Sequence, residues 1–343
     1  MKENFINAIK KAQIEVMSKN KKFCIVGIEV SYEKLGYKKQ FPNQVFEMPV
    51  SEASINGFAV GLAARGYKPF VHHGRVEFAL HGFDQIFTQA SKWNYMFGGN
   101  YRCPVSFKIS LGRRQGDGPQ HTDGYHSLFL QANNLDIYIP STPQEAFDNI
   151  FEISNNKNPS IFLEHRRSYL ITQTIKKNKN KKKLFGFYES KVKSEILLVT
   201  YGDGLIDCLL AKEDLIKNNI GINILCINKF LSKKKVNTEL LEKILKFYEI
   251  IFFDTRPFDF GPLNSISGQL TFYNQNRKIN ASKISPVNLP APSSYKLMKN
   301  YYPNKVSIIK KVCKILKYKK KITSKLNADY LYNFPKIDLD NLI

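Results

Sequence analysis

The 343-residue chain is predicted to be an α/β protein of two domains, each a mostly parallel sheet flanked by helices. Three observations predict this class. Short apolar runs recur along the chain, as expected for buried parallel strands. Amphipathic helical patterns separate these runs, and the connections between them are short. A lysine-rich stretch near the middle divides the chain, and 343 residues are enough for two separate cores.

The first half alternates helices with strands. Strands are predicted where the apolar runs are bounded by glycine, proline or polar residues. Ser141 or Thr142 is predicted to cap another helix, with Glu145 at the capping-box spacing from Thr142. The segments 31–47 and 111–121 have the composition of loops. The other predicted helices are 3–18, 52–65, 78–96 and one ending near 131, and the strands are 23–30, 69–72, 105–110, 136–139 and 160–164.

The second half repeats the alternation after a lysine-rich linker. The predicted domains are therefore 1–167 and 193–316, joined by the linker 168–192. The tail 317–343 mixes basic, aromatic and acidic residues without a clear period, and it receives no assignment. Predicted strands here are 196–200, 222–227 and 250–254, and predicted helices are 205–217, 237–248, 262–275 and 305–316.

The formal net charge of +23 raises the question of nucleic acid or an anionic membrane as a partner. The lysines cluster in three runs, at 176–183, 233–235 and 317–321. These runs contain lysine and asparagine, with few arginines and no interleaved aromatic residues. We therefore interpret them as solvated surface in preference to a nucleic-acid site, although they would attract a phosphate-bearing ligand.

Targeting signals and disulfide patterns are not visible. No apolar run is long enough to span a membrane, and the N-terminus has no signal-peptide core, so we expect a cytoplasmic protein without a membrane partner. The five cysteines lie far apart and form no CxxC pair. Reduced, buried thiols and no zinc site are the expectation.

Residues 48–71 read as a loop, a helix and a strand, and one carboxylate stands at their centre. Ser51 is suited to cap the helix, and Glu52 follows in its first turn. In an α/β protein this turn lies at the sheet edge where ligands bind. Glu52 is thus a candidate site residue, with compensation of the helix dipole as the alternative.

Seven short motifs stand in order along the first half, at residues 49–52, 83–86, 89–92, 95–99, 118–121, 140–143 and 158–165. Together they resemble the β subunit of the thiamine-diphosphate-dependent, decarboxylating component of 2-oxo acid dehydrogenases, such as those acting on pyruvate and branched-chain acids. The likeness covers 1–166 and continues more weakly to about 316. It implies a transketolase-like pyrimidine-binding domain followed by a transketolase C-terminal-type domain.

The resemblance implies that this chain binds the aminopyrimidine ring of thiamine diphosphate. Glu52 matches the carboxylate that hydrogen-bonds a ring nitrogen and so helps the exocyclic amine to take the proton of the thiazolium carbon. Phe78 matches an aromatic residue beside the ring, with core packing as the alternative. His121 matches a histidine near the reacting centre that orients substrate or moves protons, with a surface histidine as the alternative.

Two basic features depart from the family pattern. Arg75 stands where many members carry small or apolar residues, and it is predicted either to bind an anionic substrate group or to form a surface salt bridge. Arg113 and Arg114 add two cations in the following glycine-rich loop. These changes leave the substrate open.

A potassium ion is implied by a further likeness. The segment 153–158 resembles the turn whose backbone carbonyls hold a structural K⁺ in some members. The implied ligands are backbone atoms of Ile153, Ser154, Asn156 and Asn158.

The diphosphate half of the cofactor site is incomplete. Gly202-Asp203-Gly204 begins like the GDG…NN signature for Mg²⁺ and diphosphate, but no Asn pair follows at the required distance. Mg²⁺ should therefore be held mainly by an α-type subunit that carries the signature. The resemblance implies an α2β2 assembly with the active site at the subunit interface.

Three functions are compatible with these residues. The favoured one is the β subunit of a 2-oxo acid dehydrogenase that transfers an acyl group to the lipoyl group of an acyltransferase. The second is a two-subunit thiamine-dependent carboligase or ketolase with an aldehyde or sugar acceptor, which the extra cations favour. The third is a non-catalytic basic scaffold that binds nucleic acid.

Overall fold

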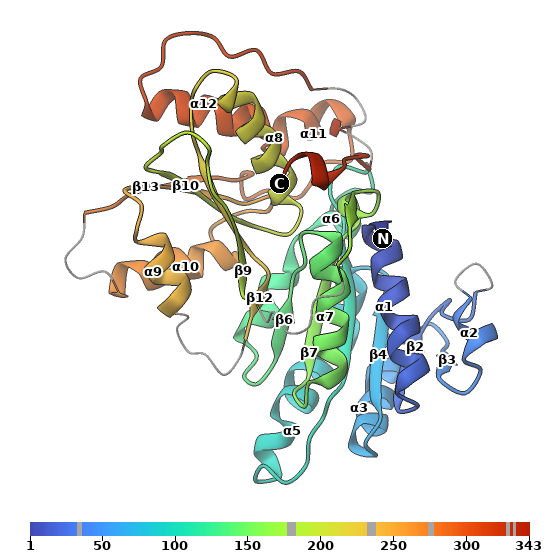
Figure 1. Cartoon of the computed structure of the whole chain (residues 1–343). Helices are drawn as coiled ribbons and strands as arrows, with labels where there is room; N and C mark the ends of the chain where they lie inside the picture. Colours follow the sequence, from blue (N-terminus) through green and yellow to red (C-terminus); the bar gives the residue numbers. More distant parts are fainter. Residues whose placement is uncertain (33–35, 177–182, 232–237, 274–277, 327–329, 332–333) are drawn as a thin grey trace.

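The computed structural model describes residues 1–343 except 33–35, 177–182, 232–237, 274–277, 327–329 and 332–333. The described residues form a seven-stranded sheet, a five-stranded sheet and a two-stranded ribbon, with helices around the two larger sheets (Figure 1). The predicted α/β class with mostly parallel sheets is confirmed.

The seven-stranded sheet has the order β12-β6-β7-β5-β4-β2-β3. Every neighbouring pair is parallel except β12 and β6. The loops that follow these parallel strands therefore meet at one edge of the sheet, where ligands bind in such folds. The strands are β2 (Phe23–Gly27), β3 (Val45–Glu47), β4 (Lys68–His73), β5 (Ser106–Leu111), β6 (Asp136–Tyr138), β7 (Ser160–His165) and β12 (Lys229–Phe230).

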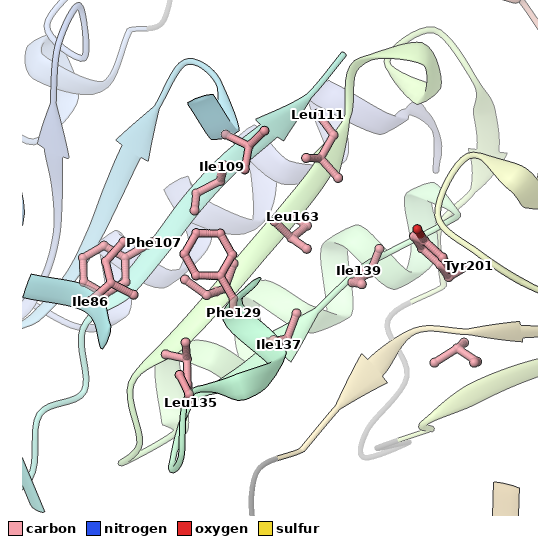
Figure 2. Packing of buried hydrophobic residues seen from close by; sticks show 14 of the residues in the cluster. Ile86, Phe107, Ile109, Leu111, Phe129, Leu135, Ile137, Ile139, Leu163 and Tyr201 are labelled. Atoms are coloured by element: carbon pink, nitrogen blue, oxygen red, sulfur yellow. The ribbon is translucent and has the colours of Figure 1, made fainter. Parts of the chain in front are cut away.

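Helices cover both faces of this sheet. On one face α1 (Phe5–Lys19) and α7 (Pro143–Asn155) pack against each other and against the sheet (Figure 1). On the other face α3 (Glu52–Ala64) packs against β4 and β2. Residues of β5 and β7 that belong to the same apolar cluster are shown in Figure 2. Because side chains alternate along a strand, Phe162 of β7 joins the first cluster and Leu163 joins the second.

The predicted helix 78–96 is not continuous. It is divided into α4 (Val76–Ala79), the 3₁₀ turn η2 (Leu80–Gly82), the π-helical segment η3 (Gln85–Ala90) and α5 (Ser91–Met96). A π segment marks an extra residue within a helix and often lies at a functional site. The predicted helix ending near 131 is likewise two short pieces, α6 (Pro119–Thr122) and the 3₁₀ helix η4 (Tyr125–Gln131).

The five-stranded sheet has the order β14-β13-β10-β11-β9, and only β9 is antiparallel to its neighbour. One face is covered by α8 and α12. One apolar cluster extends from the first sheet to the other face, where α9 and α10 lie. The elements are β9 (Phe185–Tyr188), β10 (Ile196–Tyr201), β11 (Asn223–Ile227), β13 (Glu249–Phe253), β14 (Asn280–Ile284), α8 (Gly204–Ile216), α9 (Thr238–Ile244), α10 (Pro262–Tyr273), α11 (Tyr295–Tyr301) and α12 (Lys305–Ile315), with β14 and α11 not predicted.

The predicted linker 168–192 contains structure. It includes β8 (Thr172–Thr174), which pairs with β1 (Lys2–Asn4), and it also includes β9. The stretch 31–47, predicted as a loop, contains α2 (Tyr37–Gln40) and β3. Most of the first lysine run and the lysines at 233–235 lie outside the described residues. The domain boundaries remain a prediction.

The C-terminal tail returns to the boundary between the two sheets. Its last turn, η6 (Leu339–Asn341), buries Leu339, and the Asp340 carboxylate accepts hydrogen bonds from the backbone N and the Oγ1 of Thr174. Phe334 stacks on Tyr169, with 6.1 Å between the ring centroids. The tail is therefore a packed part of the structure, although the lysines at 317 and 319–321 are exposed, as predicted for solvated surface.

Two other expectations concern the environment of the chain. Of the helices in the described part of the chain, none has both the length and the apolarity to cross a bilayer. The five cysteines are free, and four of them are buried.

Candidate active site

Glu52 is the first residue of α3, at the edge where the parallel strands of the first sheet end. It is half-buried, and none of the described residues forms a hydrogen bond or an ion pair with its carboxylate. Ser51 precedes it as the N-cap, but the Ser51 hydroxyl bonds Ser54 Oγ at 2.9 Å and does not cap a backbone amide as predicted. The Glu52 carboxylate is therefore available to a ligand.

A buried polar contact holds the first turns of α3 against the segment after Phe78. Asn56 Nδ2 donates to the carbonyl of Gly82 at 3.0 Å, and Asn56 Oδ1 lies 2.8 Å from Nε2 of His73. A Cβ at position 82 would lie 2.8 Å from the Glu52 carbonyl oxygen and even closer to Asn56. Only glycine fits there, which fixes the position of Glu52 relative to α4.

A cleft of about 580 Å³ lies beside α4. Phe78 and His121 face each other in it, edge to face, with 5.5 Å between ring centroids and an interplanar angle of 89°. The Phe78 side chain remains 38% exposed, so it is not a core residue. The lining residues are Glu77, Phe78, His81, Pro119, Gln120, His121, Asp123, Tyr125 and Pro290.

Arg75 lies outside the lining of this cleft. Its Nη1 donates to the carbonyl of His121 at 3.0 Å, and its Nη2 pairs with Asp117 Oδ2 at 2.7 Å. The side chain is only 14% exposed. Of the two predicted roles, the structure therefore supports an ion pair within the protein and gives no support to contact with a substrate.

Comparison with known proteins identifies the first half of the chain. Residues 2–171 match the model of the transketolase pyrimidine-binding domain. They belong to that domain family. Glu52 and all the cleft residues except Pro290 lie within the matched residues, so the candidate site is formed mainly by the pyrimidine-binding domain.

Relatives extend the likeness beyond the pyrimidine-binding domain. The pyruvate dehydrogenase E1 component subunit beta of Rickettsia felis is 25% identical over 329 residues, which cover 91% of this chain and 97% of the relative. The mitochondrial E1 subunit beta of Saccharomyces cerevisiae is 24% identical and covers 90% of this chain and 87% of the relative. The resemblance to the β subunits of thiamine-dependent dehydrogenases is therefore confirmed.

Two further comparisons broaden the family. The acetoin:2,6-dichlorophenolindophenol oxidoreductase subunit beta of Cupriavidus necator is 26% identical and covers 80% of this chain and 81% of the relative. A solved split-gene transketolase, described as an inactive beta4 tetramer, superposes with a TM-score of 0.74 at 17% identity and covers 92% of this chain and 99% of that chain. This likeness supports the two-domain transketolase fold.

Glu77 is a cleft residue that the sequence analysis missed. Its Oε1 accepts a hydrogen bond from the backbone N of Asp123 at 3.0 Å, and its Oε2 is buried without a partner among the described residues. Burial raises the pKa of this carboxyl group, although Arg256 lowers it in part. The sequence signal that could have identified Glu77 is its position immediately before Phe78, a predicted site residue.

Asp203 of the Gly202-Asp203-Gly204 motif joins the two halves of the chain, because it contacts Arg113 of the first half and Thr255 of the second. Asp203 is fully buried, with Oδ2 2.6 Å from Nε of Arg113 and Oδ1 accepting from Thr255 Oγ1 at 3.0 Å. Burial alone would raise the pKa of Asp203, but Arg113 and His165 hold it well below its usual range. Because its oxygens are already occupied, Asp203 does not fit a Mg²⁺ ligand.

Arg113 and Arg114 are therefore not substrate-facing cations. Arg113 also donates from Nη2 to Asp207 at 2.9 Å, and Arg114 donates from Nη2 to the carbonyl of Pro303 at 2.7 Å. Both side chains are buried between the first sheet and the second half of the chain. The predicted contribution of these two arginines to substrate preference was wrong, because nonlocal partners bury them.

The implied potassium site does not fit this pyrimidine-binding domain. The ammonium group of Lys68 donates to the carbonyl of Ser154, and the carbonyl of Ile153 accepts from the backbone N of Asn156 at 3.0 Å. The Asn156 side chain closes the turn, since its Nδ2 donates to Asp136 Oδ2 at 2.8 Å. Burial, together with nearby Lys157, lowers the pKa of Lys68. The Lys68 ammonium group on the Ser154 carbonyl occupies the place of a bound cation.

We expect K⁺ to give no specific stabilisation of the chain. A lysine ammonium already lies on the Ser154 carbonyl, and a bound ion would stabilise the fold only in proportion to its occupancy. Thermal unfolding measured in equal concentrations of KCl and NaCl should give the same midpoint. A midpoint that is higher in KCl than in NaCl would contradict this.

Proposed function

We propose that the chain is the β subunit of a thiamine-diphosphate-dependent 2-oxo acid dehydrogenase whose active site is shared with an α-type subunit. The main support is the Glu52 carboxylate, which is half-buried and has no partner among the described residues. It lies on the first turn of α3, which is held against the segment that contains Phe78 and His81. A carboxylate of this kind suits a heterocyclic nitrogen that shares a proton. The aromatic face of Phe78 suits a planar ring.

The residues of this chain have separate roles in the proposal. Thiamine diphosphate, when bound, supplies the electron sink for decarboxylation of a 2-oxo acid. Glu52 holds a proton at the pyrimidine nitrogen, and Phe78 limits the position of the ring. His121 lines the cleft, where its imidazole nitrogens have no hydrogen-bond partner among the described residues and can hold or move a proton of the substrate.

The diphosphate and Mg²⁺ are assigned to a partner. In the described part of the chain no group of three or more histidine, cysteine or acidic residues is arranged to hold a metal ion. Asp203, the second residue of the diphosphate-like motif, is paired with Arg113. An α-type subunit with the complete signature, in an α2β2 assembly, would supply the missing half.

A carboligase or ketolase is the second candidate, and the cleft lining favours it. Glu77, His81, Asp123 and Tyr125 present hydrogen-bonding groups beside Phe78. Such a lining suits a hydroxylated acceptor better than a short apolar acyl group. Dependence of turnover on a lipoyl domain would identify the dehydrogenase, whereas product formation with a hydroxyaldehyde and no lipoyl domain would identify the carboligase.

Affinity purification of the tagged chain from its native cell tests the proposal. We expect mass spectrometry to find a co-purifying subunit that carries the GDG…NN signature. A lipoyl acyltransferase in the same eluate would favour the dehydrogenase, and its absence would favour the carboligase. Recovery of the chain without any such subunit would contradict the shared active site, since the sequence does not contain the complete GDG…NN signature.

A further inference from the structure

One arginine connects the two ends of the turn that carries His121. Arg75 is the N-cap residue of α4, directly after β4 and Gly74. Its Nη1 donates to the carbonyl of His121 at 3.0 Å, and its Nη2 pairs with Asp117 at 2.7 Å. A single guanidinium group therefore spans the segment 117–121 and holds both of its ends.

The surroundings of this guanidinium leave it little freedom. A Cβ at Gly112 would lie 2.5 Å from the His121 carbonyl oxygen and 2.8 Å from Arg75 Nη1. The backbone after β5 thus packs directly on the contact, and Arg256 donates to the Gly112 carbonyl. Arg75 is enclosed between the end of β5 and the His121 turn.

The His121 ring has few other restraints. Among the described residues no hydrogen bond is formed with either of its ring nitrogens. Its position depends on the edge-to-face contact with Phe78 and on the anchoring of its own backbone. Phe78 lies on the same short segment as Arg75, three residues later, so one segment determines both the ring contact and the backbone anchor.

We infer that Arg75 is a positioning residue, which fixes the His121 turn so that the imidazole keeps its place against Phe78 in the cleft. The planar guanidinium offers two donors at a fixed separation, which a lysine ammonium cannot reproduce. The catalytic importance of this anchor rests on the proposed function. The anchoring itself is a property of the folded chain and can be tested without substrate.

Histidine NMR measures the anchor directly. The chain contains six histidines, so labelling of the imidazole Cε1 carbon gives a simple spectrum in which a His121→Gln variant assigns the His121 signal. In Arg75→Met we expect that signal to shift and broaden, and in Arg75→Lys we expect a partial change. Arg166→Met is the matched control, because Arg166 approaches Asp117 at 3.7 Å and has no bond to His121.

Buried His73 reports on the fold in the same spectra. It bonds Asn56 and does not line the cleft, so its signal should stay unchanged in Arg75→Met, Arg75→Lys and Arg166→Met. A His121 signal in Arg75→Met that matches the wild type in position and width would overturn the inference. A change in the His73 signal of Arg75→Met would mean that this variant has an altered fold. The His121 signal of Arg75→Lys would then decide whether Arg75 anchors the His121 turn.

Kinetics separate the anchor from a substrate contact. With the reconstituted two-subunit enzyme and pyruvate, Arg75→Met should lower kcat by about tenfold to a hundredfold, with KM within about twofold, because a small misplacement of a reacting group is costly. A rise in KM with unchanged kcat would instead show substrate binding and overturn the inference. If the wild type shows no turnover, the proposed function fails while the NMR result still decides the role of Arg75.

Discussion

Glu52→Gln is expected to lower thiamine-dependent turnover of the reconstituted enzyme by about a hundredfold to ten-thousandfold, the range lost when a positioned acid or base is removed. Glutamine keeps the size and one hydrogen bond but cannot hold the shared proton. The Glu52 carboxylate has no partner among the described residues whose loss would disturb the fold. Turnover of pyruvate with an artificial electron acceptor, measured beside the wild type, checks this expectation.

Assembly and stability provide the controls for this variant. If Glu52 only compensates the dipole of α3, the replacement costs about 0.3–1 kcal/mol of stability and leaves activity intact. The exposed residue Glu195, far along the chain before β10, offers a matched Glu195→Gln control. Full activity of Glu52→Gln in an assembled complex would refute the catalytic assignment.

Arg113→Met is expected to lower the free energy of unfolding by about 3–5 kcal/mol, because it leaves buried carboxylates without their cation. Arg113 is 1% exposed and pairs with Asp203 at 2.6 Å and Asp207 at 2.9 Å. Methionine occupies a similar volume, so the loss comes from charge and not from a cavity. Urea unfolding of the full chain measures it.

Two further variants make this result specific. Exposed Arg65 forms no ion pair with any of the described residues, and Arg65→Met should change stability by no more than about 0.5 kcal/mol. Adding Asp203→Asn to Arg113→Met removes one unpaired charge and should recover part of the loss, giving a coupling of about 0.5–3 kcal/mol. Equal stability of Arg113→Met and the wild type would mean that the pair contributes nothing net.

The strands of both sheets were predictable because each strand is a contiguous apolar run in the sequence. Runs such as 105–110 and 160–164 are apolar throughout, since both faces of a parallel sheet are covered, and they become β5 and β7. The helix 78–96 has the expected apolar spacing, but its continuity fails at Gly82. The close approach of that glycine to Glu52 and Asn56 is a tertiary contact that no local pattern announces.

The candidate site divides in the same way. The family motifs led to Glu52, Phe78 and His121, and the structure brings the last two together in one cleft. The roles of these residues remain proposals. Arg113 and Arg114 were wrongly predicted to be free cations. Their partners Asp203 and Pro303 lie 90 and 189 positions further along the chain. Burial by distant segments cannot be read from a loop sequence.

The tail contact between the two sheets has a consequence for synthesis on the ribosome. Strands β2 to β7 all precede residue 166 and can associate while the chain is still emerging. Arg167, however, lies over the ring of Tyr330, and Lys2 pairs with Asp338 across 336 positions. These contacts must wait for the last residues, and contacts of such sequence separation form slowly. The nascent first half therefore carries Arg113 without Asp203 and Asp207 until α8 is made, and Arg167 without Tyr330 until the tail is made.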